Sequence, residues 1–196
     1  MNKIIICAVL CISLLFTGCE EPLVYKYQDK AQPIECSGID KALLHEALYS
    51  FKEDLGHFYK DPDVRAGSDR FYMLGLATYV EDGLLGLADY KKIASPHTLK
   101  VFEELKMQEQ IWDENSEVSN FDYNSEFANC LFDNIIDEEI KSFFKRLKEV
   151  DALDPKQIAN LMRRKIYKAY TDHHLTMYIA MDGFYQHLYE LDKKGN

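Results

Sequence analysis

The stretch GIDKALLHEALYSFKEDLGHFY, residues 38–59, decides the fold. Its apolar residues recur every three or four positions: Ile39, Leu43, Ala47, Phe51, Leu55 and Phe58. This period places them on one face of a helix, because an α-helix turns once in about 3.6 residues. The stretch therefore predicts a long amphipathic helix, which Asp61-Pro62 ends.

The same period continues along the rest of the chain. It predicts further helices over residues 70–79, 84–93, 96–112, 127–135, 140–147, 155–166 and 172–188. Ser95 and Asp154 each precede a proline, a pairing of N-cap and first-turn residue that starts helices, and Thr171 is expected to cap the last helix. No proline interrupts an apolar stripe. The pattern predicts an all-α fold, a single irregular helical bundle of about six or seven helices.

The first 18 residues have the pattern of a signal peptide. Lys3 supplies a positive start, residues 4–16 are an almost unbroken apolar run, and Phe16-Thr17-Gly18-Cys19 follows. A helix that crosses a bilayer needs about 20 apolar residues, so we expect no permanent transmembrane anchor in this run. The Gly-Cys pair directly after the run resembles the lipobox that ends the signal peptide of bacterial lipoproteins.

That resemblance implies that Cys19 is acylated on sulfur and becomes the N-terminus of the mature chain. We expect residues 1–18 to be the cleaved signal peptide, 19–35 the lipidated N-terminus and a flexible tether, and 36–196 the helical domain. The expected location is the bacterial cell envelope, anchored in the outer membrane, with the periplasmic or outward orientation left open. The alternative is an ordinary secretory signal that is cleaved nearby.

The order of features after Cys36 also resembles a known group of proteins. The helix after Cys36, the helix around Asn129-Cys130, Phe143 and the helix over 171–188 follow one another in an order similar to that of a group of small uncharacterised bacterial lipoproteins. This group has no assigned activity, so the resemblance implies export and lipidation and no catalytic residue.

The net negative charge of the chain limits the kinds of partner that it can bind. The chain has 33 acidic and 23 basic residues, a net charge of −10, which disfavours a nucleic-acid-binding module because phosphate binding needs a cationic face. Cleavage before Cys19 would remove only Lys3 among the charged residues, so the balance becomes 33 against 22, or −11. We therefore expect attachment to the bilayer through acyl chains on Cys19, each buried methylene contributing roughly 0.8 kcal/mol, and no nucleic-acid partner.

The cysteines predict one disulfide. Cys7 and Cys11 lie in the signal peptide and Cys19 is assigned to lipid, which leaves Cys36 and Cys130. Two remaining thiols in an exported chain favour a bond between them, with two separate buried thiols as the alternative. Neither thiol has a Cys-x-x-Cys partner, so the sequence supports neither a redox centre nor a four-cysteine zinc site.

The sequence assigns no catalytic residue, no metal ligand and no cofactor. His45-Glu46 opens like a zinc-protease motif, but Tyr49 stands where the second histidine is needed. His173 and His174 form the densest histidine cluster, interpreted as polarity at a helix start. The glycine-serine elbow, the phosphate loop and the dinucleotide fingerprint are absent, so the protein is not expected to be an enzyme of a familiar class.

Two further groups have alternative interpretations. Tyr178 and Tyr185 belong to a tyrosine-rich final third, which favours core packing but also allows an aromatic ligand site. The basic run 163–165 is interpreted as an exposed helix face offset by surrounding acids.

Three hypotheses of function follow. The first is a membrane-anchored envelope lipoprotein that acts as a non-enzymatic interaction module, with an envelope protein as candidate partner. The second is a small-ligand or solute-binding lipoprotein with a pocket between helices, lined by Tyr178 and Tyr185, with His173 and His174 as further candidate ligand contacts. The third is an unrecognised hydrolase, which requires His173 or His174 to hydrogen-bond a carboxylate or hydroxyl in a cleft.

Overall fold

The computed structural model of the chain describes residues 22–116, 118–149 and 155–195. These residues form α2 (Lys41–Phe58), α3 (Asp69–Tyr79), α4 (Tyr90–Ile93), α5 (Pro96–Lys106), α6 (Glu126–Asn134), α7 (Glu138–Glu149), α8 (Pro155–Ala169), α9 (His173–Ala180) and α10 (Gln186–Gly195). A 3₁₀ turn, η1 (Gly83–Leu85), precedes α4, and a π-helical turn, η2 (Met181–Tyr185), joins α9 to α10. Counting α9, η2 and α10 as one continuous helix, the described ranges contain eight helices, which confirms the all-α prediction.

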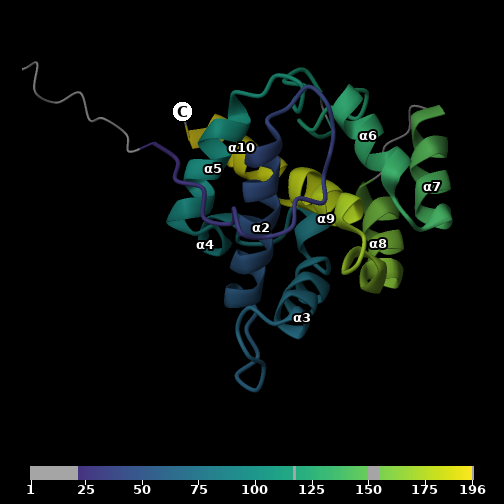
Figure 1. Cartoon of the computed structure of the whole chain (residues 1–196). Coiled ribbons are helices and arrows are strands. Elements are labelled where there is room, and N and C mark those ends of the chain that lie inside the picture. Colours follow the sequence, from purple (N-terminus) through teal and green to yellow (C-terminus); the bar gives the residue numbers. More distant parts are fainter. Residues whose placement is uncertain (1–21, 117, 150–154, 196) are drawn as a thin grey trace, which may run out of the picture.

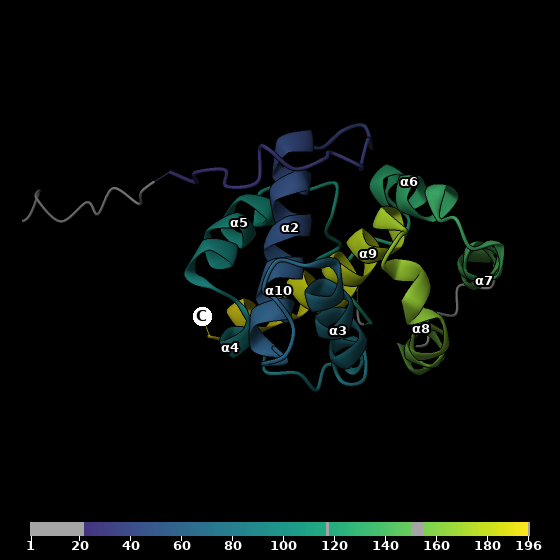
Figure 2. The same cartoon turned by 60° about the horizontal axis from the view of Figure 1, so that its bottom comes forward.

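Helix α2 lies at the centre of the bundle. It packs against α3, α4, α5 and α9 (Figures 1 and 2). Every residue from Leu43 to Leu48 is buried, so the prediction of one apolar face was too narrow. A helix enclosed on all sides also buries its polar residues, here Glu46, Ser50 and Asp54. Buried polar groups need hydrogen-bond partners, and Glu46 has them in the segment before α2 and in α5.

The C-terminal helix crosses α2 and ties the bundle together. Tyr185 of the π-helical turn η2 donates a hydrogen bond of 3.0 Å to the carbonyl of Ala47 in α2. The capping residue differs from the prediction: Asp172, not Thr171, is the N-cap of α9, and its Oδ1 accepts from the Leu175 amide at 3.0 Å. The second carboxylate oxygen accepts from the Ile136 amide at 2.6 Å, so Asp172 also links α9 to the α6–α7 connection.

Two predicted helices are shorter than expected. The helix expected over 84–93 is interrupted because Gly86 adopts a φ of +74°, so α4 begins only at Tyr90. Helix α5 ends at Lys106 and does not continue to Trp112. The Trp112 indole instead donates to the carbonyl of Leu105 at 2.8 Å, and its backbone forms an isolated β-bridge with Phe121.

Helix α3 lies directly on α2 because two glycines meet at the contact. A Cβ added at Gly75 would lie 2.8 Å from the backbone N of Gly56 and 2.9 Å from the carbonyl oxygen of Leu55. These are backbone atoms, so the helices would have to separate. Gly75 is therefore a point of close contact between the two helices.

We expect Gly75→Ala to lower the free energy of unfolding by roughly 1–3 kcal/mol, the usual range for an overpacked core. Urea denaturation followed by circular dichroism measures the change. Gly195→Ala is the matched control, because a Cβ at Gly195 meets nothing within 4 Å. Equal stability of the two variants would contradict the tight α2–α3 contact.

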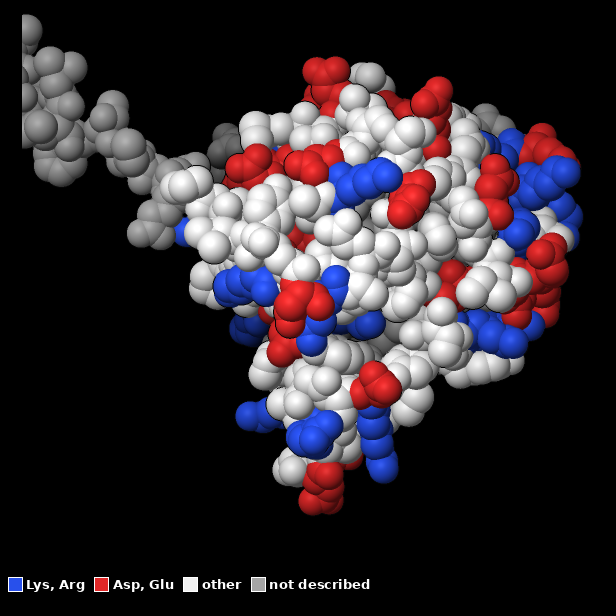
Figure 3. Space-filling view, in the orientation of Figure 1, with Lys and Arg blue, Asp and Glu red and all other residues white. Residues whose placement is uncertain are grey.

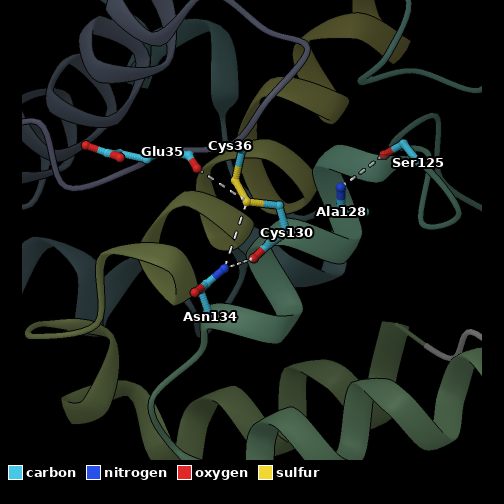
Figure 4. The surroundings of a disulfide bond; sticks show 6 residues. All are labelled: Glu35, Cys36, Ser125, Ala128, Cys130 and Asn134. Atoms are coloured by element: carbon cyan, nitrogen blue, oxygen red, sulfur yellow. Dashed lines mark hydrogen bonds between the residues drawn. A yellow bond between two sulfur atoms is a disulfide. The ribbon is translucent and has the colours of Figure 1, made fainter.

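The predicted disulfide is present between Cys36 and Cys130, with Cα atoms 5.8 Å apart. It joins the segment before α2 to the middle of α6 (Figure 4). Local hydrogen bonds stabilise both ends of α6. At its start, the Oγ of Ser125 accepts from the Ala128 amide at 3.0 Å. At its end, the Asn134 side chain donates to the Cys130 carbonyl at 2.9 Å. The alternative of two separate thiols is therefore excluded.

Candidate functional site

The two predicted tyrosines lie in the core. Tyr178 and Tyr185 each expose 0% of their surface, and burial raises the pKa of both phenols well above the usual value. The Tyr178 hydroxyl donates to Asp182 Oδ2 at 2.8 Å, and the Tyr123 hydroxyl donates to the same oxygen at 2.7 Å. Neither Tyr178 nor Tyr185 lines the cavities beside α5, beside α10 or between α7 and α8, and both side chains are fully enclosed by the core.

His173 and His174 begin α9 and are half-buried, and this burial lowers the pKa of both imidazoles. His173 Nδ1 is buried without a hydrogen-bond partner. In the part of the chain that the structure describes, neither histidine hydrogen-bonds a carboxylate or a hydroxyl, the contact that the hydrolase hypothesis requires. Over the same residues, no three His, Cys, Asp or Glu side chains gather in a way that could hold a metal ion.

Cys19 and the signal-peptide pattern lie outside the described residues. Among helices within 22–116, 118–149 and 155–195, none has the length and apolar character to cross a membrane.

A polar cluster that the sequence did not predict surrounds Glu46. This side chain is completely buried in α2, and its carboxylate accepts three N–H groups. The backbone amides of Lys26 and Tyr27 donate at 2.7 and 3.2 Å, and His97 Nε2 donates from α5 at 2.6 Å. Three donors on one carboxylate satisfy a charge that would otherwise be very unfavourable to bury. We call Glu46, His97 and the amides of Lys26 and Tyr27 the Glu46 clamp.

The neighbouring histidine strengthens the same attachment. His45 Nε2 lies 2.6 Å from the carbonyl oxygen of Tyr27. Because a carbonyl only accepts, this ring nitrogen carries the proton. The Tyr49 hydroxyl donates to the Ala31 carbonyl at 3.2 Å, one turn further along α2. The His45-Glu46 pair, which fails as a zinc motif, thus holds the N-terminal segment.

The segment 22–35, expected to belong to a flexible tether, instead packs along α2. Its residues from 22 to 27 alternate between exposed and half-buried, Leu23 contacts the core and Ile34 is 3% exposed. The packing of this segment could not be predicted because it has no helical period, and an extended segment shows only a weak alternation of apolar and polar residues. The folded body therefore begins well before Cys36.

A cavity of about 460 Å³ opens beside the Glu46 clamp. It is lined by Pro22, Val24, Lys26, Pro96, His97 and Lys100. The prolines and the valine offer an apolar wall, and the lysines offer positive charge at its rim. The lining can therefore contact an apolar group and an anionic group together.

Little in the sequence indicates this site. Glu46 and His97 are 51 residues apart, and only the fold brings them together. The one local hint is that the apolar residues Leu43, Leu44, Ala47 and Leu48 flank Glu46 in the sequence. Comparisons with protein-family models, with curated proteins and with solved structures found no match. Functional inference therefore depends on the residues of this chain.

Proposed function

We propose that the protein is a lipid-anchored protein of the bacterial cell envelope, in the outer membrane, and that its helical body is a non-enzymatic interaction module. The observation that carries the exported location is the disulfide between Cys36 and Cys130. Disulfides form and persist in oxidising compartments outside the cytosol. This supports the same conclusion as the apolar N-terminal run and the Gly-Cys pair that follows it.

The Glu46 clamp supports a position of the body close to the membrane. Pro22 is the third residue after Cys19, and three residues span at most about 11 Å. From Pro22 onward the chain lies against the folded body, and the clamp holds it at Lys26 and Tyr27. An acylated Cys19 would therefore keep the end of the body that carries Pro22 next to the lipid headgroups.

Charge placement supports the interaction part of the proposal. Residues 138–169, which include α7 and α8, contain nine Lys and Arg against five Asp and Glu, a net charge of +4. The rest of the chain has 14 basic against 28 acidic residues, a net charge of −14. A cationic region on an acidic body is an arrangement that favours one orientation toward an anionic partner.

The anchor is tested by expressing the full chain in a bacterium with a radiolabelled or alkyne-bearing fatty acid. We expect label on the wild-type protein and at least a tenfold loss of label in Cys19→Ala, because the acylated sulfur is gone. Cys11→Ser is the matched control and should keep full labelling, since Cys11 lies within the signal peptide. A mature wild-type chain that carries no label and begins at another residue would establish an ordinary secretory signal and contradict the proposal.

A further inference from the structure

The cationic region has a cavity at its centre. Figure 3 shows Lys and Arg side chains gathered over α7 and α8, at the right edge of the molecule, among acidic ones. A cavity of about 340 Å³ lies between these two helices. Its polar lining consists of Glu139 and Arg146 from α7 and Gln157, Asn160 and Arg164 from α8. Phe143 and Leu161 supply its apolar part.

Most neighbouring cations already have partners. Lys165 pairs with Glu139 at 2.6 Å and with Asp137 at 3.5 Å. Arg163 pairs with Glu81 at 3.2 Å, and the Lys148 ammonium donates to the side chain of Asn129. These contacts attach α7 and α8 to the surrounding helices. They leave these cations little freedom to hold a ligand.

The two arginines of the cavity differ from these neighbours. Neither Arg146 nor Arg164 has an ion pair or hydrogen bond to another residue within the described ranges. The one carboxylate in the lining, Glu139, is already neutralised by Lys165. The cavity therefore presents two guanidinium groups whose charge is not balanced by a contacting acid, beside two side-chain amides.

We propose that the cavity between α7 and α8 binds a small hydroxylated ligand that carries a phosphate or carboxylate group, with Arg146 and Arg164 as the anion-binding residues. A guanidinium presents a planar fork of N–H donors that matches both kinds of oxyanion. The amides of Gln157 and Asn160 provide donors and acceptors for hydroxyl groups, and the Phe143 ring provides an apolar surface. This inference rests on the interaction part of the proposed function and does not depend on the lipid anchor.

The test is isothermal titration calorimetry on the full chain purified from membranes in a neutral detergent. The probes are glucose 6-phosphate, glucuronate and uncharged glucose. We expect the two anionic probes to bind and glucose to bind at least tenfold more weakly, because a hydrogen bond to a charged group is stronger than one between neutral groups. The stronger of the two anionic probes identifies phosphate or carboxylate as the preferred group.

Substitutions assign the binding to the cavity. Arg146→Gln and Arg164→Gln are each expected to weaken binding of the anionic probe at least tenfold, and Arg146→Lys by an intermediate factor, because lysine keeps the charge but loses the fork. Lys145→Gln is the control: it removes one positive charge from an exposed residue of α7 that does not line the cavity. Unchanged circular dichroism spectra and melting temperatures verify that the variants fold.

The inference is overturned if no anionic probe binds, if glucose binds equally well, or if Lys145→Gln weakens binding as much as the arginine variants do. The last outcome would assign the effect to the general field of the helix face. These results are independent of the fatty-acid labelling. If no anionic probe binds but Cys19 carries the fatty-acid label, only the ligand site is rejected. If the probe binds but the chain carries no label, only the lipid anchor is rejected.

Discussion

Replacing both Cys36 and Cys130 by alanine is expected to lower the free energy of unfolding by about 4–5 kcal/mol. The bond joins positions 94 residues apart, and a closed loop of that length strongly restricts the unfolded chain. Domains of ordinary stability unfold at a cost of about 5–15 kcal/mol, so this loss would take away a large share of the total. Urea denaturation of the oxidised wild type and of the double variant measures the difference.

The reduced wild type is the internal control. Kept reduced by a thiol reductant and not alkylated, it should unfold close to the double variant, because both lack the same cross-link. A difference below about 1 kcal/mol between oxidised wild type and double variant would show that the cross-link adds little, contrary to the chain-entropy argument. Alanine is used because Cys36 is 1% exposed, and a serine hydroxyl there would add the separate cost of a buried polar group.

Helix starts were predictable because their signals are local. Ser95 and Pro96 begin α5 as expected, with Ser95 Oγ accepting from the Thr98 amide at 3.2 Å. Helix ends were less predictable because distant contacts decide them. The apolar period continues past Lys106, but the chain is no longer helical at Trp112. There the indole donates to the Leu105 carbonyl, and the backbone forms a β-bridge with Phe121.

The disulfide could be predicted because only two cysteines remained after the other three had been assigned. The Glu46 clamp could not, since the partners of Glu46 come from a non-helical segment and from α5. For the basic run 163–165 the interpretation was correct only in part. Arg163 and Lys165 are indeed offset by acids, whereas Arg164 has no acid partner among the described residues. Which charged side chains form ion pairs depends on their positions in the fold, and these positions cannot be deduced from composition.

Glu46→Ala is expected to lower the free energy of unfolding by about 3–5 kcal/mol, because three donors lose their acceptor and each buried polar group left unsatisfied costs about 1–3 kcal/mol. The variant leaves the amides of Lys26 and Tyr27 and the ring N–H of His97 without their acceptor. Glu46→Gln retains one accepting oxygen and should lose less. Glu103→Ala is the control: its ion pair with Lys106 is exposed, and such pairs contribute about 1 kcal/mol or less.

The local consequence of Glu46→Ala distinguishes a clamp from a general stabiliser. Hydrogen exchange at the Lys26 and Tyr27 amides should accelerate far more than exchange in α6 or α9, because these two amides lose their acceptor directly. Uniform acceleration along the chain would contradict the clamp. The contacts of His45 with the Tyr27 carbonyl and of Tyr49 with the Ala31 carbonyl remain in this variant and still hold the rest of the segment on α2. Under the proposed acylation of Cys19, the carboxylate of Glu46 would help to hold the body close to the membrane.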